Sequence, residues 1–120
     1  MHNVDNTSLI YKICSRREWG AATRSGSYCG SADDLRDGYI HLSTAEQTRA
    51  TAAKYFAGRG DLVLVAVDPE PVRARLRWEP SRGGALFPHI YGSLPVSAAV
   101  WARDLALGSN GVHVFPDGFA

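Results

Sequence analysis

His41, Ser43 and Thr44 form the first group of residues whose types and spacing are suited to chemistry. The segment 39–43 alternates as a strand does, so the side chains of His41 and Ser43 share one face, about 7 Å apart. Thr44 and Gln47 form a capping box, which predicts that a helix begins where the strand ends. The free N–H groups of a helix start suit a phosphate, with His41 as a candidate catalytic acid–base residue. The alternative is that Ser43 and Thr44 only cap the helix, with His41 half-buried and satisfied.

A second group follows in the segment 79–84, where an acid, an arginine and two glycines lie close together. Gly83 and Gly84 permit a positive φ and a close approach of the backbone to a ligand. Arg82 is a suitable donor to a phosphate or a carboxylate, and Glu79 is a candidate acid, base or ribose acceptor. The alternative is a surface turn in which Glu79 and Arg82 are solvated.

The third group is the aromatic segment 87–91. If this segment is a strand, the imidazole of His89 and the phenol of Tyr91 share one face, which makes His89 a second candidate catalytic residue. Phe87 and Tyr91 could stack on a base or on a nicotinamide ring. The alternative is a core aromatic cluster that contains one buried, hydrogen-bonded histidine.

Composition limits the partners that these groups could serve. The chain has 120 residues, 45% of them hydrophobic, and a formal net charge of +1. The alternating residues Arg73, Arg75 and Arg77 could contact a phosphate backbone, but such a stripe is more often the solvated face of an edge strand. Because the chain is almost neutral, a nucleic acid is the least favoured partner.

The same composition predicts one domain at residues 9–120, after a flexible N-terminal tail at residues 1–8. The longest apolar stretch, 62–67, is far shorter than the ~20 residues of a membrane-spanning helix, so we expect no membrane partner. The polar N-terminus lacks the apolar core of a signal peptide, which predicts a cytoplasmic protein. Two cysteines and four histidines without zinc-like spacing indicate two free thiols and no metal site.

The elements that position these groups can be predicted from periodicity and turn residues. Capping boxes at Ser15 and Thr44 predict two helices. The first should bury Trp19 and Ala22, and the second should end at about Phe56 and carry Ala52, Tyr55 and Phe56 into the core. Alternating or continuous apolar runs predict strands at 9–14, 39–43, 61–67, 72–78, 98–105 and 112–115. Gly- and Ser-rich stretches predict loops at 24–33 and 81–85. We therefore predict an α+β fold with several short strands and two helices.

Taken in order, the motifs resemble the bacterial "domain of unknown function 952" family from about residue 9 to about residue 100. The motifs that carry the resemblance are Ile10-Tyr-Lys-Ile13, Tyr28-Cys-Gly-Ser31, Asp37-Gly-Tyr-Ile-His-Leu-Ser-Thr-Ala45 with Gln47, Lys54-Tyr-Phe56, Trp78-Glu79, Ser81-Arg-Gly-Gly84 and Phe87-Pro-His-Ile-Tyr-Gly92. That family is similar in fold to the ADP-ribosyltransferase superfamily, which includes RNA 2′-phosphotransferases. The resemblance implies two small split sheets with a dinucleotide-sized cleft between them, for a ligand or cofactor such as NAD or ADP-ribose.

The resemblance also implies roles for single residues. Lys12 stands where the superfamily carries a His or Arg that contacts the adenosine ribose of NAD. The strand with His41, Ser43 and Thr44 matches the second motif. The third motif of the transferases carries a catalytic Glu, whereas the matching region here carries His89 and Tyr91, and Glu79 lies upstream in a different local setting. The phosphotransferase branch uses basic residues instead, which fits His41, Arg82 and His89.

Two hypotheses about function stay open at this point. In the first, the chain is a divergent ADP-ribosyl- or 2′-phosphotransferase-type enzyme acting on an NAD-like or ADP-ribose-like phosphate ligand. Lys12 and Arg82 would then hold phosphates, Phe87 or Tyr91 would stack on a ring, and one of the two histidines would be the acid–base group. In the second hypothesis, the same cleft binds a peptide or a metabolite without chemistry.

Overall fold

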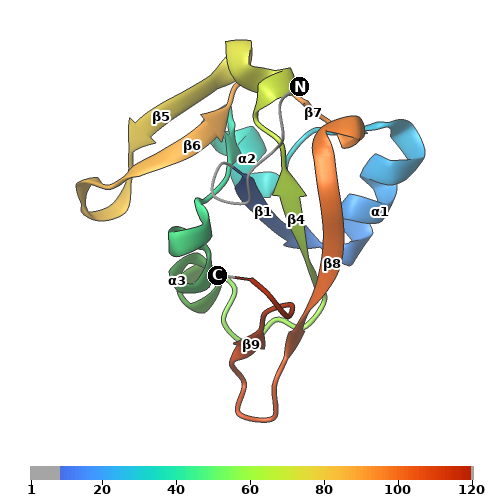
Figure 1. Cartoon of the computed structure of the whole chain (residues 1–120), viewed down its shortest axis with the longest axis vertical. Helices are drawn as coiled ribbons and strands as arrows, with labels where there is room; N and C mark the ends of the chain where they lie inside the picture. Colours follow the sequence, from blue (N-terminus) through green and yellow to red (C-terminus); the bar gives the residue numbers. More distant parts are fainter. Residues whose placement is uncertain (1–8, 120) are drawn as a thin grey trace.

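The computed structural model describes residues 9–119, apart from the side chain of Arg82, so the predicted tail at residues 1–8 lies outside the described residues. Short helices and strands succeed one another along the chain (Figure 1). In order they are β1 (Ile10–Ser15), α1 (Arg16–Ser25), β2 (Ser27–Tyr28), α2 (Ala32–Asp37), β3 (Ile40–His41), α3 (Ala45–Tyr55), β4 (Leu62–Val67), the 3₁₀ helix η2 (Glu70–Arg75), β5 (Leu76–Pro80), η3 (Arg82–Gly84), β6 (Leu86–Ile90), β7 (Leu94–Pro95), η4 (Val96–Ala98), β8 (Ala99–Leu107) and β9 (His113–Val114).

The strands form small, separate antiparallel sheets. The largest has the order β1-β4-β8-β9, a second has the order β3-β6-β5, and a third pairs β2 with β7. An α+β fold with small antiparallel sheets is thus confirmed, although the described residues form three sheets and not the two that the resemblance implies. The two sheets that matter for the site meet at a single bridge between Tyr11 and Ser43, which brings β3 to the free edge of β1.

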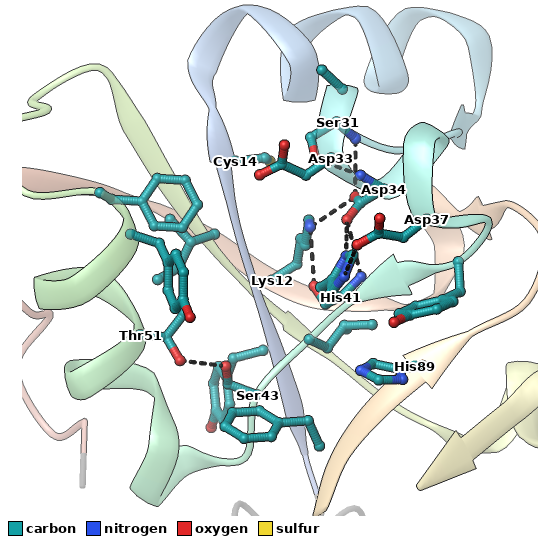
Figure 2. Close-up of a pocket in the computed structure, with 18 of the residues that line it drawn as sticks. Lys12, Cys14, Ser31, Asp33, Asp34, Asp37, His41, Ser43, Thr51 and His89 are labelled. Atoms are coloured by element: carbon teal, nitrogen blue, oxygen red, sulfur yellow. Dashed lines mark hydrogen bonds and ion pairs between the residues drawn. The ribbon is translucent and has the colours of Figure 1, made fainter. Parts of the chain in front are cut away.

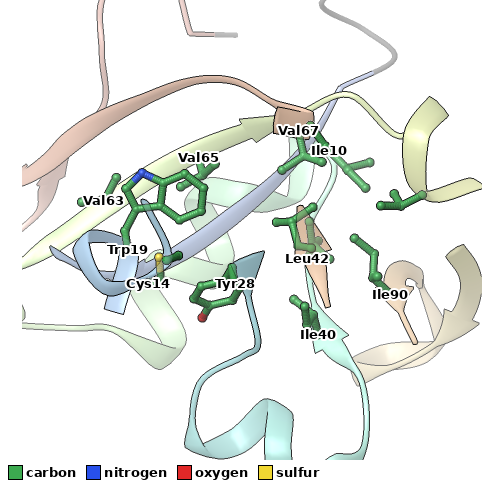
Figure 3. Packing of buried hydrophobic residues seen from close by; sticks show 14 residues of the cluster. Ile10, Cys14, Trp19, Tyr28, Ile40, Leu42, Val63, Val65, Val67 and Ile90 are labelled. Carbon is green, nitrogen blue, oxygen red and sulfur yellow. The ribbon is translucent and has the colours of Figure 1, made fainter. Parts of the chain in front are cut away.

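The core surrounds β4, whose six residues are all buried. Alternate residues of this strand enter two different hydrophobic clusters, because successive side chains of a strand point to opposite faces. Val63, Val65 and Val67 pack into the cluster shown in Figure 3, which also contains residues of α1 and the smaller sheets. Leu62 and Leu64 pack on the other face, against α3. The large sheet therefore lies between α1 and α3 (Figure 1), as its continuous apolar sequence predicts.

Both predicted capping boxes are confirmed, at Ser15 with Glu18 and at Thr44 with Gln47. The prediction of only two helices and of a loop over 24–33 is wrong, because the described residues also form β2 and the short helix α2. A third capping box opens α2: the Ser31 hydroxyl accepts from the N–H of Asp34, and the Asp34 carboxylate accepts from the N–H of Ser31. Aspartate thus replaces the glutamate or glutamine that is usual at this position.

The predicted strand over 72–78 is wrong in its first half. Residues 70–75 form η2, and only the rest belongs to β5. Pro69 and Pro71 explain the difference, because each fixes φ near the helical value at the start of the turn. Val72 is nevertheless fully buried.

The basic stripe of Arg73, Arg75 and Arg77 does not form, since these residues lie on two different elements. The Arg73 guanidinium lies 3.8 Å from Glu70. Arg75 donates to the carbonyl of Ser93 at 2.6 Å, and the Arg77 guanidinium lies over a tyrosine ring. The structural basis for a nucleic-acid surface on this stripe is therefore missing.

Helix α3 differs from the prediction at its C-terminal end. Ala52 is buried, as predicted, but Tyr55 is half exposed and Phe56 is only partly buried. No helix among the described residues is both long and apolar enough to cross a membrane.

Candidate functional site

A cleft of about 540 Å³ lies between two walls, one formed by α2 and one by the C-terminal half of α3. Residues of β1 and β3 form its floor, and the β5–β6 hairpin closes one end (Figure 2). We call this space the central cleft. Of the predicted site residues, five line it: Lys12, His41, Ser43, Phe87 and His89.

The other predicted site residues are placed differently. Thr44, Gly83, Glu79 and Tyr91 are not among the described residues that line the central cleft. Gly83 adopts a positive φ of 68°, which confirms the predicted conformation and turns the tip of the β5–β6 hairpin. The side chain of Arg82 lies outside the described part of the chain.

The floor of the cleft holds a buried ion pair between Lys12 and Asp34. The Lys12 ammonium lies 2.8 Å from Oδ2 of Asp34, and the side chains are only 5% and 1% exposed. The ammonium also donates to the carbonyl oxygen of His41 at 3.0 Å. Burial by itself raises the pKa of Asp34, but hydrogen bonds from His41 and Lys12, with the Lys12 charge, outweigh burial and hold that pKa far below its usual range. Asp34 is therefore ionised at neutral pH, at the centre of this network.

His41 is held from three sides by carboxylates of α2. Its Nδ1 lies 2.6 Å from Oδ1 of Asp34, and its backbone N–H donates to the same oxygen at 3.1 Å. Its Nε2 lies 3.0 Å from Oδ2 of Asp37. Both ring nitrogens are thus engaged, and Figure 2 shows Asp34 and Asp37 converging on the ring. The side chain remains 34% exposed, so it lines the cleft without presenting a free nitrogen.

Asp34 is the functional residue that sequence reasoning missed. Its signal is the capping-box motif Ser31-x-x-Asp34, which begins inside the stretch 24–33, where the Gly- and Ser-rich composition predicts a loop. The chain approaches this side chain closely: a Cβ at Gly30, where φ is +120°, would stand 2.8 Å from the Cβ of Asp34. A glycine at position 30 is therefore required by both conformation and space.

A second histidine–carboxylate pair lies on the β5–β6 hairpin. His89 donates from Nδ1 to Oε1 of Glu79 at 2.7 Å, and the Tyr91 hydroxyl donates to the same carboxylate at 2.8 Å. The strand register explains the contact, because Glu79 pairs with Phe87 and therefore lies diagonal to His89. The hydrogen bonds that His89 and Tyr91 donate lower the pKa of Glu79. The hydrogen bond from the Tyr91 hydroxyl to Glu79 also raises the pKa of Tyr91.

The two pairs are neighbours across the β3–β6 ladder, in which His41 is directly opposite His89. Their ring centroids are 5.5 Å apart. The Tyr39 ring stacks on His89, with centroids 4.1 Å apart and planes inclined by 26°, and also contacts the rings of His41 and Tyr91. Burial, then the charges of Asp37 and Glu79, raise the pKa of Tyr39. The structure thus gathers four rings and their carboxylates at one end of the cleft.

The predicted phosphate site at the start of α3 is occupied by the chain's own groups. The Thr44 hydroxyl accepts from the N–H of Gln47, whose side chain donates to the carbonyl of Leu86. The Ser43 hydroxyl lies 3.0 Å from that of Thr51, as Figure 2 shows. The capping alternative therefore describes Thr44, while Ser43 still lines the cleft.

Both cysteines are free, as expected, although their surroundings differ. Cys14 lines the cleft from a buried position, and that burial raises the pKa of its thiol to about 12, whereas Cys29 is exposed. Within residues 9–119, no group of three or more His, Cys, Asp or Glu side chains is arranged to hold a metal ion.

Comparisons with known proteins give the family and the structural relatives of the chain. The family described as "Protein of unknown function (DUF952)" matches residues 13–102. The crystal structure of protein CC0527 from Caulobacter crescentus is 55% identical, covers 88% of this chain and 93% of that chain, and superposes with a TM-score of 0.84. The solution NMR structure of the same protein, matched over 90% of its chain, gives a TM-score of 0.79. No curated protein matches the chain.

Proposed function

The chain belongs to the DUF952 family of proteins of unknown function, and we propose that its central cleft binds a nucleotide-like phosphate ligand of the NAD or ADP-ribose kind. In this proposal His89 is the acid–base residue of an ADP-ribosyl- or 2′-phosphotransfer-type reaction, the reaction class that a relationship of this family to the ADP-ribosyltransferase superfamily would imply. One observation carries the proposal: a buried imidazole, oriented by a carboxylate, stands in the wall of a cleft large enough for a small molecule.

The size and lining of the central cleft support a ligand of this kind. About 540 Å³ lies within the range of roughly 300–1,000 Å³ that is typical of small-molecule sites. Tyr39 and Phe87 offer aromatic surfaces for a flat ring, and the Ser43 hydroxyl offers a polar contact for a sugar. A ring joined to a hydroxyl-rich, phosphorylated sugar combines the groups that this lining would bind.

The geometry of His89 supports acid–base chemistry. Because the Glu79 carboxylate accepts a hydrogen bond from Nδ1, that nitrogen carries a proton, and in the neutral form of the ring the lone pair is on Nε2. Among the described residues, none is hydrogen-bonded to Nε2. In the proposed reaction, Nε2 takes the proton of the attacking hydroxyl group and returns it to the leaving group.

Glu79 places a carboxylate beside His89, in the region that matches the third transferase motif but has no glutamate of its own. It comes from β5 rather than from the strand that matches the transferase motif, yet its side chain reaches both His89 and Tyr91. We assign Glu79 to orienting His89, because its oxygens already accept hydrogen bonds from that ring and from the Tyr91 hydroxyl.

The proposal gives Lys12 and His41 a different part from the one expected. The Lys12 ammonium is buried against Asp34, and both ring nitrogens of His41 face carboxylates. A phosphate would have to compete with these carboxylates for Lys12, at the cost of leaving Asp34 as an unpaired buried charge. These residues therefore shape the floor of the cleft in our proposal, and His89 alone exchanges protons.

A non-catalytic binding module is the second candidate, and the charge of the lining favours it. Among the described lining residues, the acids Glu18, Asp33, Asp34 and Asp37 outnumber the cations Lys12, Arg36 and Arg59. An acidic cleft is better suited to a neutral or basic metabolite or peptide than to a polyphosphate. This alternative retains the same cleft but no proton transfer.

Titration calorimetry with NAD, ADP-ribose and a 2′-phosphorylated RNA oligonucleotide tests the proposal, followed by mass spectrometry of the products. We expect binding of at least one of these ligands, and a product whose formation is lost in His89→Ala. No binding at millimolar concentration of any of the three would overturn the proposed ligand class. Binding without any product would instead support the non-catalytic module.

A further inference from the structure

The cations that line the central cleft differ in how firmly their charges are paired. Lys12 is buried, 2.8 Å from Asp34. Arg36 is bonded to Asp37 at 3.0 Å and to Asp33 at 3.1 Å. Arg59 is paired most weakly. Its Nε and Nη2 lie 3.4 and 3.5 Å from the carboxylate of Asp61, and the two side chains are 46% and 62% exposed. A ligand can displace such an exposed partner at little cost.

The backbone of Arg59 is held more firmly than its side chain. Its N–H donates to the carbonyl of Phe56 at 3.0 Å, and its own carbonyl lies 2.8 Å from Nε2 of His113, a buried residue. The guanidinium lies over the Phe56 ring, 5.6 Å from its centroid. Arg59 thus has a firmly held backbone and an exposed guanidinium beside an aromatic ring. A ligand can replace the weakly bound partner of this guanidinium.

The position of Arg59 gives the central cleft two unlike walls. The α2 wall carries Asp33, Asp34 and Asp37 together with Arg36, whose charge is already bonded to Asp37 and Asp33, so this wall is net negative and would repel a phosphate. Arg59 follows α3 and lines the opposite wall, beside Phe56. In Figure 2, the green helix α3 and the cyan helix α2 lie on different sides of the blue strand β1. An anionic group therefore finds its favourable partner only at the α3 side of the described lining.

We propose that Arg59 is the anion anchor of the central cleft and binds a phosphate of the ligand in place of Asp61, while the ring of the ligand lies toward Tyr39 and His89. A guanidinium can hold two phosphate oxygens at once through its parallel N–H donors. This inference rests on the proposed function and adds the direction in which a phosphorylated nucleoside lies in the cleft.

The test compares ADP-ribose with adenosine, which lacks phosphate, by titration calorimetry of the wild-type chain and three variants. Arg59→Ala is expected to weaken ADP-ribose binding about ten- to a hundredfold, the effect of losing a charge-assisted hydrogen bond, and to leave adenosine binding unchanged. Asp61→Ala is expected to strengthen ADP-ribose binding, because it frees the guanidinium. Arg73→Ala is the matched control, because Arg73 is also an exposed arginine in a weak ion pair but is not among the described residues that line the cleft, and it is expected to change ADP-ribose binding no more than about twofold.

The possible outcomes separate a failure of the Arg59 anchor from a failure of the proposed function. If the wild-type chain binds ADP-ribose and Arg59→Ala binds it equally well, the anchor is overturned and the proposed function stands. An equal loss for adenosine and ADP-ribose in Arg59→Ala also overturns the anchor, because the residue then acts on folding or on the ring. If the wild-type chain binds none of the proposed phosphate ligands, the proposed function falls and the anchor falls with it.

Discussion

The two histidines that face each other across β3 and β6 lie in opposite kinds of surroundings. His41 has both ring nitrogens against carboxylates of α2, one of which is itself buried and paired with Lys12. His89 has one ring nitrogen bonded to Glu79, a partly exposed residue at the hairpin, and its other nitrogen has no described partner. We call His41 closed because both of its ring nitrogens are bonded, and His89 open because one of its ring nitrogens has no described partner. The terms refer to the nitrogens and not to burial, since the His89 side chain is only 4% exposed and that of His41 is 34% exposed, and the rings are 5.5 Å apart.

This difference separates a structural role from a chemical one. A buried network in which every charged group has a partner contributes order and is costly to break. A histidine with one fixed and one open nitrogen is the arrangement that proton transfer needs. We therefore expect substitutions around His41 to act on folding and substitutions at His89 to act on turnover.

The largest effect is expected for Asp34→Ala, which removes the partner of Lys12, the acceptor of His41 and the cap of α2 together. Removing one member of a buried ion pair costs about 3–5 kcal/mol of unfolding free energy, and urea unfolding followed by circular dichroism measures it. The control is Asp33→Ala on the same helix, where the side chain is 72% exposed and the expected change is within about 0.5 kcal/mol. Similar losses in the two variants would contradict the structural role of the network.

His89→Gln is expected to have the next largest effect, on turnover rather than on folding. Removing a general acid–base group lowers the rate about a hundredfold or more, and product formation from the bound ligand measures it. The matched variant His41→Gln should retain more turnover while it loses more stability. The comparison fails if His41→Gln is the more severely impaired variant in turnover.

The pH dependence of stability should follow Asp34. Because its pKa in the folded chain is lowered from 3.8, the unfolded chain takes up a proton at a higher pH than the folded chain does. The contribution of Asp34 to stability is therefore complete well above pH 3.8 and is lost as the pH falls below that value. Urea unfolding of the wild-type chain and of Asp34→Asn, measured from neutral pH to below pH 3.8, should show that the unfolding free energy of the wild type falls more steeply in acid. Parallel plots of unfolding free energy against pH would exclude this role of Asp34.

The smallest effect is expected for Tyr91→Phe, which removes one of the donors to Glu79 and leaves the bond from His89 in place. Turnover should fall by no more than a few-fold, with the pKa of Glu79 rising because a hydrogen bond that lowers it is lost. NMR titration of the Glu79 carboxyl measures that pKa. A loss as large as that of His89→Gln would mean that Tyr91, rather than His89, takes part in the reaction.

The elements that could be predicted are those determined by interactions between residues close together in the sequence. The capping boxes at Ser15 and Thr44 and the continuous apolar run of β4 are local signals, and the structure confirms them. Over 72–78, the alternation of apolar and polar residues predicts a strand, but the two prolines that precede it favour a 3₁₀ turn, which forms instead. The missed helix α2 is short and is opened by an aspartate variant of the capping box.

Several residues of the candidate site could be predicted from the sequence, but the contacts between its basic and acidic side chains could not. Lys12, His41, Ser43, Phe87 and His89 were identified and line one cleft. Which carboxylate each basic group contacts could not be predicted, because Lys12 meets Asp34 and His89 meets Glu79 only through the packing of different elements. Those pairings decide that His41 is closed and His89 open, and they changed the roles that the sequence had suggested.

The most direct test of this account is an NMR titration of the chain, labelled with ¹⁵N in its histidine rings, with ADP-ribose. We predict that the Nε2 resonance of His89 shifts to saturation, and shifts more than either ring nitrogen of His41. A larger shift at His41, or no shift at either histidine at millimolar ADP-ribose, would contradict the assignment of His89 as the open, reactive group of the central cleft.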